Sequence, residues 1–587
     1  MFRRCLLAVC LLGSAAWCQP VSQKNPITGE WSGTIAGQLR VIVRVDRAAD
    51  DSLHASLESI DQGHVKIDVD EASFDGQKSV RFELKKIGAS YQAELSPDGF
   101  ELAGTWQQGG ARVPLTLRRS DAPPVKPLEP VVRGRVPLTP CPAAGGGQGL
   151  CGTFEVFENR AARTGRKIPL HILILPAQSE KPAADPVFGF AGGPGQSAAE
   201  AFPLVTAMVT LRREHDLVLI DQRGTGKSNP LPCPTDDKDA QSFLKGSGGS
   251  AVKDLPACRK ELEAHADLTQ YTTSISADDV DEVRDALGYQ KIDALGGSYG
   301  TLAALIYLRR HAEHVRSVVL EGVATPDYRL PLAFAKTIQE SLDHLFAGCA
   351  ADPACHKEFP NLKAEFETVV NRLTDQPATF QLASGPDKGQ TVTITRGAFV
   401  SALRPLLYQP GIVSRLPYIF HQAFENNFNP FATVSAAMRR AVGQSIARGM
   451  SYSVTCSESL PFISERDIRR ETAGTYLGDF DVRAYQKNCA IWPHAEVSKD
   501  FLKPVRSDVP VLLIAGAEDP ATPASWAEHA AASLSNSRVV VIPHGTHLTA
   551  SQCIDNMIVQ FINQGSSSGI DTACVSEIRN PRFATSP

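Results

Sequence analysis

A serine held between glycines is the residue of this sequence best placed to act as a nucleophile. Ser298 lies in Gly296-Gly297-Ser298-Tyr299-Gly300, between a segment that predicts a strand (residues 291–295) and one that predicts a helix from Thr301. Glycines beside the serine let strand and helix approach closely, and such a turn lifts the hydroxyl above the sheet. Ser298 is therefore the candidate nucleophile. The alternative is a glycine-rich turn without chemistry.

An activated serine needs a general base and a group that orients this base. Asp519 ends the apolar segment VLLIAGAED, and His547 follows the apolar segment VVVIP after a short loop. Both lie where a predicted strand ends, so we expect them at the edge of the sheet that also holds Ser298. Glu518 and His544 compete for the two roles. We prefer Asp519 because a proline-containing turn follows it at once, and His547 because a glycine and a threonine extend its loop.

The reaction also needs N–H donors for the developing negative charge on oxygen. The segment AGGPG closes the predicted strand that begins at Val187, and its glycines leave the backbone uncovered. We assign the N–H groups of Gly193 and Tyr299 to this oxyanion hole. A plain turn between strand and helix is the alternative for AGGPG.

The segment DQRGTGKS (residues 221–228) ends like a phosphate-binding loop, but Asp221 stands where that motif requires glycine. Nucleotide hydrolysis is therefore disfavoured. We interpret Asp221 and Arg223 as a structural pair that holds this loop beside the active site.

The surrounding elements predict a sheet that carries this chemistry. After Cys151, apolar strands alternate with helical segments, which indicates a mostly parallel sheet covered on both faces. Residues 328–503 are mainly helical and interrupt the strand pattern, as a cap would. Residues 27–119 alternate short apolar runs with turns, so we expect a small all-β barrel or sandwich. The Gly-x-Trp pieces Gly29 to Trp31 and Gly104 to Trp106 resemble the lipocalin-like signature, and tryptophans that only fill the core are the alternative. The predicted division is a signal peptide (1–18), an all-β domain (27–119), a proline-rich linker (120–140), the first part of the catalytic domain (141–327), a cap (328–503) and its C-terminal part (504–578).

Composition and the first residues bear on partners and compartment. The 587 residues are 43% hydrophobic and 21% charged, which is typical of globular proteins, and 59 Lys and Arg against 64 Asp and Glu give no basic surface for nucleic acid. Residues 1–18 combine Arg3 and Arg4 with a short apolar run and small residues, which indicates a secretory signal peptide. Trp17 precedes Cys18 where a lipoprotein signal has a small residue, so we expect no lipid anchor. No transmembrane segment is expected.

Ten of the thirteen cysteines follow the expected signal peptide, an even number that suits an oxidising compartment. Their order suggests, as a hypothesis, that close neighbours pair. The pairs would be Cys141 with Cys151, Cys233 with Cys258, Cys349 with Cys355, Cys456 with Cys489, and Cys553 with Cys574. Neither CxxC nor HExxH occurs, so the sequence supports no zinc site.

Taken together, AGGPG, DQRGTGKS, GGSYG and the late Asp and His resemble the proline iminopeptidase and tripeptidyl aminopeptidase family of serine peptidases, which has the α/β-hydrolase fold. The resemblance covers roughly residues 151–574, and the C-terminal segment looks like the secreted tripeptidyl aminopeptidase branch. It implies a helical cap, release of residues from peptide N-termini, and a triad of Ser298 as nucleophile, Asp519 as acid and His547 as base. Ala191 stands where proline iminopeptidases usually have histidine, which argues against strict proline specificity.

An aminopeptidase must also bind a charged amino terminus, and a buried carboxylate is its natural partner. Glu458, held near the expected Cys456–Cys489 disulfide, is our first candidate because family members have an acidic residue in a similar context. Glu321 and Glu200 are further candidates, and a solvated surface glutamate is the alternative for each.

The sequence thus predicts a secreted or periplasmic serine hydrolase, foremost an aminopeptidase that acts on peptides through an acyl-enzyme and needs no cofactor. A carboxylesterase or amidase could use the same triad on small esters or amides. A protein of another class, which binds a ligand or cell-wall component through the β domain and has a secondary hydrolase domain, is the second alternative.

Overall fold

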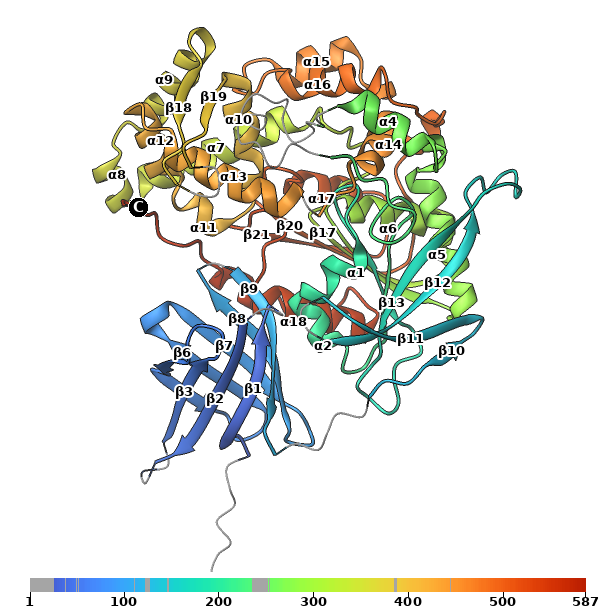
Figure 1. Cartoon of the computed structure of the whole chain (residues 1–587), viewed down its shortest axis with the longest axis vertical. Coiled ribbons are helices and arrows are strands. Elements are labelled where there is room, and N and C mark those ends of the chain that lie inside the picture. Colours follow the sequence, from blue (N-terminus) through green and yellow to red (C-terminus); the bar gives the residue numbers. More distant parts are fainter. Residues whose placement is uncertain are drawn as a thin grey trace, which may run out of the picture.

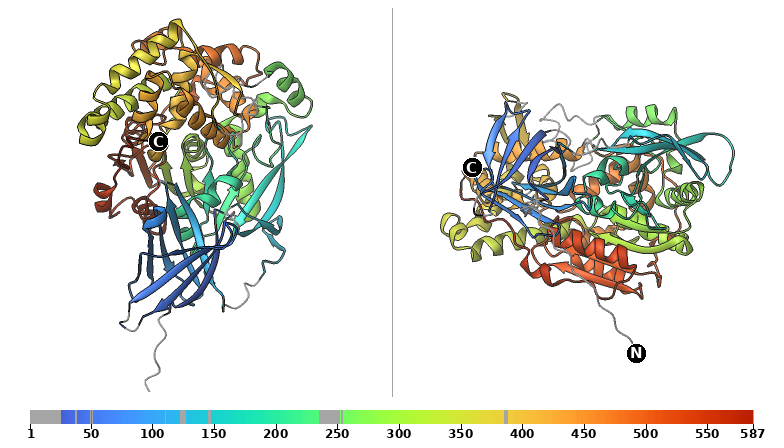
Figure 2. Two further views of the ribbon diagram at one scale, coloured as in Figure 1. Left: turned by 60° about the vertical axis from the view of Figure 1, so that its left-hand side comes forward. Right: turned by 90° about the horizontal axis from the view of Figure 1, so that it is seen from below.

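The computed structural model describes residues 26–586 except 37–38, 49, 51, 110, 122–126, 145–146, 235–251, 253, 385–387 and 444. The signal peptide expected at 1–18 and part of the expected linker lie outside the described residues. A β-barrel and a helical cap stand at opposite ends of a central α/β domain (Figures 1 and 2).

The N-terminal domain is one nine-stranded antiparallel sheet in the order β4-β3-β2-β1-β9-β8-β7-β6-β5, in which β1 pairs with β9 and the edge strands β4 and β5 do not pair with each other. A single sheet that curls back on itself is a barrel, so the sandwich alternative does not apply. Inward-facing side chains, among them Trp31, Tyr91 and Trp106, fill its core. The strands are β1 (Gly29–Ile35), β2 (Leu39–Arg47), β3 (Leu53–Ser59), β4 (Val65–Asp68), β5 (Glu71–Phe74), β6 (Ser79–Leu84), β7 (Ala89–Leu95), β8 (Glu101–Gln108) and β9 (Ala111–Arg119).

The central domain is built on a ten-stranded sheet in the order β10-β11-β12-β13-β15-β14-β16-β17-β20-β21, parallel from β15 to β21. The predicted mostly parallel sheet is therefore confirmed. Its strands are β10 (Val131–Arg133), β11 (Val136–Pro142), β12 (Gln148–Phe157), β13 (Lys167–Leu175), β14 (Val187–Phe190), β15 (Leu217–Ile220), β16 (Ile292–Gly297), β17 (Val315–Glu321), β20 (Val511–Gly516) and β21 (Ser537–Ile542).

Helices cover both faces of this sheet because its central strands are apolar on both sides. Along β15, Leu217 and Leu219 join the core under α1 (Ala198–Ala201), α2 (Thr206–Leu211) and α18 (Gln552–Gln564). Val218 and Ile220 face the opposite core, under α5 (Thr273–Leu287), α6 (Tyr299–Arg310) and α17 (Ala524–Ala531).

The linker boundary predicted at residue 140 is wrong, because β10 and β11 already belong to the central sheet. The prolines suggested an extended connector, but extended backbone is also what a strand needs. Pro140 and Pro142 lie beyond the stretch of β11 that pairs with β10, and at such an edge a missing N–H costs no ladder hydrogen bond.

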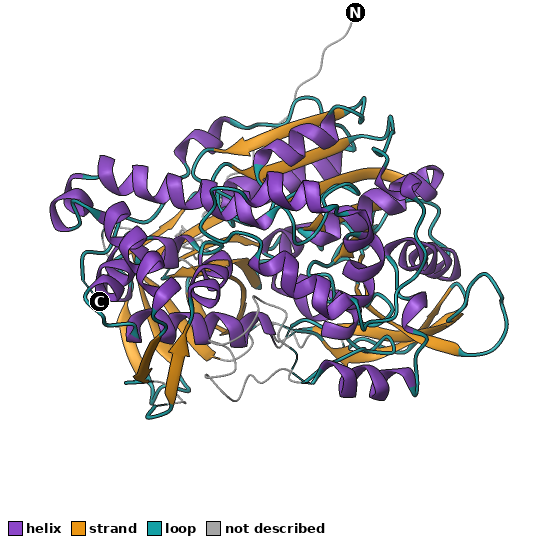
Figure 3. Ribbon diagram, turned by 90° about the horizontal axis from the view of Figure 1, so that it is seen from above, coloured by secondary structure: helices purple, strands orange, loops and turns teal. Residues whose placement is uncertain are grey.

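The cap lies over the edge of the sheet where the parallel strands end (Figures 1 and 3). It is mainly helical, as predicted, and includes one small hairpin, β18 (Ala378–Gln381) with β19 (Thr391–Ile394). Its helices are α7 (Phe334–Ala351), α8 (Pro353–Glu358), α9 (Leu362–Asp375), α10 (Arg396–Leu406), α11 (Pro410–Val413), α12 (Leu416–Phe424), α13 (Asn429–Gly443), α14 (Arg448–Glu458), α15 (Glu465–Thr472) and α16 (Phe480–Cys489); α4 (Leu255–Glu263) precedes α5 in the chain and contacts α14.

The barrel docks on α2 and α18, away from the cap (Figure 1). Arg112 of the barrel lies 3.3 Å from the Asp555 carboxylate of α18, and both side chains are buried. Arg213 pairs with Glu94 across the same interface. All five cystine pairs suggested by the cysteine order occur. Among the described residues, no helix has the length and hydropathy needed to cross a bilayer.

Candidate active site

Ser298 occupies the strained turn between β16 and α6. Its backbone has φ +56° and ψ −126°, values that side-chain-bearing residues seldom adopt. Position 300 requires glycine, because a Cβ there would collide with the carbonyl of Phe190 on the neighbouring strand β14. The predicted strand, turn and helix around Ser298 are confirmed, and the turn presents its hydroxyl at the end of the sheet.

The structure brings Ser298, His547 and Asp519 together in a line. His547 Nε2 lies 3.0 Å from Ser298 Oγ, and His547 Nδ1 lies 2.8 Å from Asp519 Oδ2. When the Nδ1–H group of a histidine donates a hydrogen bond to the carboxylate, Nε2 is unprotonated and can accept the serine proton. The arrangement can therefore deprotonate Ser298 during attack on a carbonyl.

Asp519 is 2% exposed and surrounded by donors. Its Oδ1 accepts from the backbone N–H groups of Ala521 and Thr522 at 2.7 and 2.9 Å. Burial opposes ionisation of Asp519, but the charge and hydrogen bond of His547 and these backbone donors outweigh burial and lower its pKa. Asp519 is thus held as a carboxylate.

The competing pair lies outside this line. His544 Nδ1 is 3.2 Å from Glu518 Oε1, and half of the His544 side chain is exposed. The two residues pair with each other at the surface, and neither lines the pockets at Ser298.

The residues assigned to the oxyanion hole both lie in the wall of a pocket that contains Ser298. Tyr299 is the first residue of α6, so its N–H has no acceptor within the helix. Gly193 lines both pockets that contain Ser298. The backbone approaches closely here, since a Cβ on Gly192 would lie 3.4 Å from Ser298 Cβ. Gly193 and Tyr299 therefore both line a pocket that contains the Ser298 hydroxyl.

Two adjoining pockets meet at the nucleophile. The larger has a volume of about 250 Å³ and includes His547, Arg448 and Thr455, whereas the smaller, of about 50 Å³, includes Tyr299 and Glu458. Residues common to both are Gly193, Ser298, Leu330, Phe334, Arg404 and Tyr408.

Glu458 is a carboxylate in the wall of the smaller pocket and is 3% exposed. It accepts hydrogen bonds of 2.6 Å from the Thr273 N–H and of 2.6 Å from the Thr273 hydroxyl. Burial raises its pKa to about 7, although both Thr273 bonds act in the opposite direction. A cation that entered this pocket would find a desolvated carboxylate.

The other two glutamates lie elsewhere. Glu200 is exposed on α1, and neither it nor Glu321 lines these pockets. Glu321 ends β17 behind the serine, where its carbonyl accepts from the Ser298 N–H. Burial, with the nearby Asp555 and Asp519 charges, raises the Glu321 pKa to about 8.

The predicted pairing of Asp221 with Arg223 is wrong. Asp221 accepts from the Ser197 hydroxyl at 2.6 Å and lies 3.1 Å from His171 Nδ1. Arg223 is fully buried and binds Asp279 through two hydrogen bonds of 2.6 and 2.8 Å. The two side chains leave the loop in different directions, so each fixes it to a different neighbour.

Sequence reasoning missed the polar residues that the cap contributes to the larger pocket. Arg404 of α10 and Arg448 of α14 belong to no motif and are far from Ser298 in the chain. A signal existed in α14, where Arg448, Thr455 and Glu458 recur at helical spacing. Tyr408 was also missed; its ring centroid lies 4.6 Å from that of His547.

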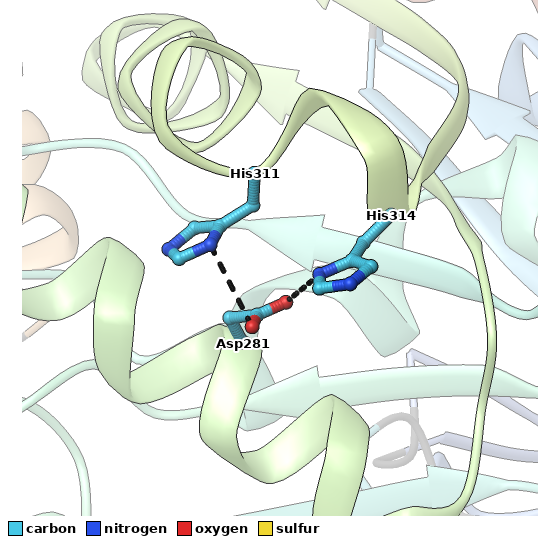
Figure 4. Close-up of side chains that lie close together, drawn as sticks. All are labelled: Asp281, His311 and His314. Atoms are coloured by element: carbon cyan, nitrogen blue, oxygen red, sulfur yellow. Dashed lines mark hydrogen bonds and ion pairs between the residues drawn. The ribbon is translucent and has the colours of Figure 1, made fainter.

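Asp281, His311 and His314 form a separate cluster whose ligand-capable atoms lie within 4.8 Å of one another (Figure 4). Asp281 already accepts from Arg284 at 2.7 Å and from the Tyr307 hydroxyl at 3.0 Å. The cluster therefore ties the C-terminal end of α6 to α5, at the opposite end of α6 from Ser298.

Comparisons with known proteins agree with this architecture. Residues 186–373 match the model of the alpha/beta hydrolase fold family, and residues 476–574 match that of the TAP-like protein family. The chain is 25% identical over 486 residues to serine protease Hip1 of Mycobacterium tuberculosis, covering 76% of this chain and 92% of the relative. It is 24% identical over 422 residues to the tripeptidyl aminopeptidase of Streptomyces lividans, covering 65% and 75%.

A shorter match, 29% identical over 151 residues, links the chain to the proline iminopeptidase of Xylella fastidiosa and covers 25% of this chain and 34% of that protein. Both family models fall within the central domain and cap, where the expected resemblance lies. The chain is therefore a serine hydrolase with the α/β-hydrolase fold, and it is similar to serine peptidases and aminopeptidases that match over most of its length.

Proposed function

We propose that this protein is an aminopeptidase that releases residues from the free N-termini of short peptides through Ser298, His547 and Asp519. The observation that carries the proposal is the buried Glu458 carboxylate in a pocket that also contains the nucleophile. An ammonium group loses its hydration in such a pocket, and a carboxylate compensates that loss.

In this mechanism Ser298 Oγ attacks the carbonyl carbon while His547 Nε2 takes its proton. The N–H groups of Gly193 and Tyr299 stabilise the oxyanion. His547 then donates the proton to the leaving amine, which departs as the shortened peptide. Water, deprotonated by His547, hydrolyses the acyl-enzyme and restores Ser298.

Thr273 would couple recognition to catalysis. Its hydroxyl donates to Glu458 and lies 2.7 Å from the Tyr299 hydroxyl, which must then donate to Thr273. The residue that supplies an oxyanion N–H is thus linked by side-chain hydrogen bonds to the proposed ammonium site. This supports Thr273 as a positioning residue for both.

We also propose that the protein acts outside the cytoplasm. Five disulfides support this, because such bonds persist mainly in oxidising compartments.

Product analysis tests the proposed activity. A peptide with a free N-terminus is incubated with the enzyme and its products are identified by mass spectrometry, with Ser298→Ala as the control. The proposal predicts fragments that lack N-terminal residues, and none with the variant. Cleavage only at internal bonds, or turnover of ester reporters without any peptide cleavage, would contradict it and favour an endopeptidase or a carboxylesterase.

A further inference from the structure

The larger pocket contains an unusual concentration of polar groups without partners. Six buried side-chain polar atoms lack a hydrogen-bond partner among the described residues, and four of them belong to residues that line this pocket. They are Arg404 Nε, Ser435 Oγ, Arg448 Nε and Thr455 Oγ1. Ser435 and Thr455 are only 2% and 1% exposed. Buried polar groups are normally hydrogen-bonded, so their concentration at one place favours a site that binds a polar ligand.

The two guanidinium groups also give this pocket an excess of positive charge. In the part of the chain that the structure describes, no carboxylate lies within ion-pair distance of Arg404 or Arg448. Arg404 stacks on the Phe334 ring at 3.9 Å and donates to the Tyr408 hydroxyl at 2.9 Å. Asp481 acts on Arg404 only at longer range and is hydrogen-bonded to Ser401 at 2.9 Å. Of these two guanidinium groups, Arg448 therefore has the positive charge that its surroundings compensate less.

Helix α14 carries its charges at the ends where they are least favourable. Arg448 is its first residue and Glu458 its last, whereas the helix dipole favours anions at the N-terminal end and cations at the C-terminal end. Arg448, Thr455 and Glu458 lie on one face, which contributes Arg448 and Thr455 to the larger pocket and Glu458 to the smaller one. A ligand that places an anionic group beside Arg448 and a cationic group beside Glu458 would compensate the unfavourable charge at each end of α14.

We propose that Arg448, Arg404 and Thr455 form a subsite that binds a carboxylate on the leaving part of the substrate. This inference rests on the proposed function, because the ammonium at Glu458 fixes which pocket receives the leaving part. Guanidinium groups bind carboxylates with strong, charge-assisted hydrogen bonds, and the Thr455 hydroxyl adds a neutral donor. The carboxylate is either the C-terminus of a short peptide or an acidic side chain.

For the C-terminal source, α14 also predicts a length. Arg448 and Glu458 are about 15 Å apart along the helix axis at the standard rise per residue. An extended peptide advances about 3.3–3.6 Å per residue, so four to five residues span the two charges. Peptides of this length would bind with both termini paired.

Matched peptides test the subsite. A tetrapeptide with a free C-terminal carboxylate is compared with its C-terminal amide, and, among amides, a peptide with Glu in the leaving part is compared with its Gln counterpart. The proposal predicts a kcat/KM at least about tenfold higher for one of the carboxylate forms. A preference within the first pair identifies the C-terminus as the source of the carboxylate, and a preference within the second pair identifies an acidic side chain.

Arg448→Gln should bring the preferred ratio close to one, whereas Arg469→Gln, on the exposed surface of α15 in the same cap, should leave it unchanged. If native enzyme treats acids and amides alike in both pairs, the subsite is excluded without any variant having to fold. N-acetylation of the same peptides distinguishes this subsite from the proposed ammonium site. If acetylation leaves kcat/KM unchanged while the preference for carboxylates persists, only the ammonium site is contradicted.

Discussion

Glu458 and Thr273 are joined by two hydrogen bonds of 2.6 Å, one from the backbone N–H and one from the hydroxyl. This pairing orients the carboxylate but does not neutralise it, and burial keeps the pKa of Glu458 at about 7. The charge proposed to hold the substrate ammonium therefore changes within the physiological pH range.

A pH dependence follows from this raised pKa. A carboxyl with a pKa near 7 is ionised above that pH and protonated below it, so ammonium recognition is present above about pH 7 and lost as the pH falls. Between pH 7.5 and 5.5, where a peptide N-terminus is mainly protonated and becomes more so as the pH falls, the kcat/KM ratio of free to N-acetylated peptide should still fall by about tenfold or more. The ratio cancels titrations that both substrates share. A flat ratio would contradict the role of Glu458.

Asp519→Asn should lower kcat by about 10³- to 10⁴-fold, because an amide cannot hold His547 in the tautomer that accepts the serine proton. Glu518→Gln is the matched control, since Glu518 pairs with His544 at the surface and should retain nearly full activity. Steady-state kinetics of both variants decides the assignment. A large loss in Glu518→Gln with a mild effect in Asp519→Asn would reverse it.

Arg223 should matter for stability. It is fully buried and donates two hydrogen bonds to Asp279, so Arg223→Met leaves this buried carboxylate with Arg160 as its remaining ion-pair partner and should lower the free energy of unfolding by about 2 kcal/mol or more. Arg310→Met, which removes a more exposed pair with Asp278, should cost less than about 1 kcal/mol. Denaturant unfolding of both variants measures the difference. Equal losses would contradict the assigned role of Arg223.

The residues predicted from sequence are those whose chemistry is encoded locally. Ser298 stands in a glycine-flanked turn, and Asp519 and His547 each follow an apolar strand, so short segments sufficed to single them out. Arg404, Arg448 and Thr273 escaped prediction because only the cap and α5 bring them to the serine. The partners of Asp221 and Arg223 were wrong because adjacent loop residues point in different directions. The linker boundary failed because prolines suit both an edge strand and a connector.

The most direct test of the central claim compares kcat/KM for one peptide with a free N-terminus and for the same peptide N-acetylated, at pH 7.5. The account predicts that acetylation lowers kcat/KM by about tenfold or more, because it removes the charge that Glu458 would bind. It also predicts that Glu458→Gln loses most of this discrimination. Equal cleavage of the two peptides by the native enzyme would contradict an aminopeptidase and leave a serine hydrolase of different specificity.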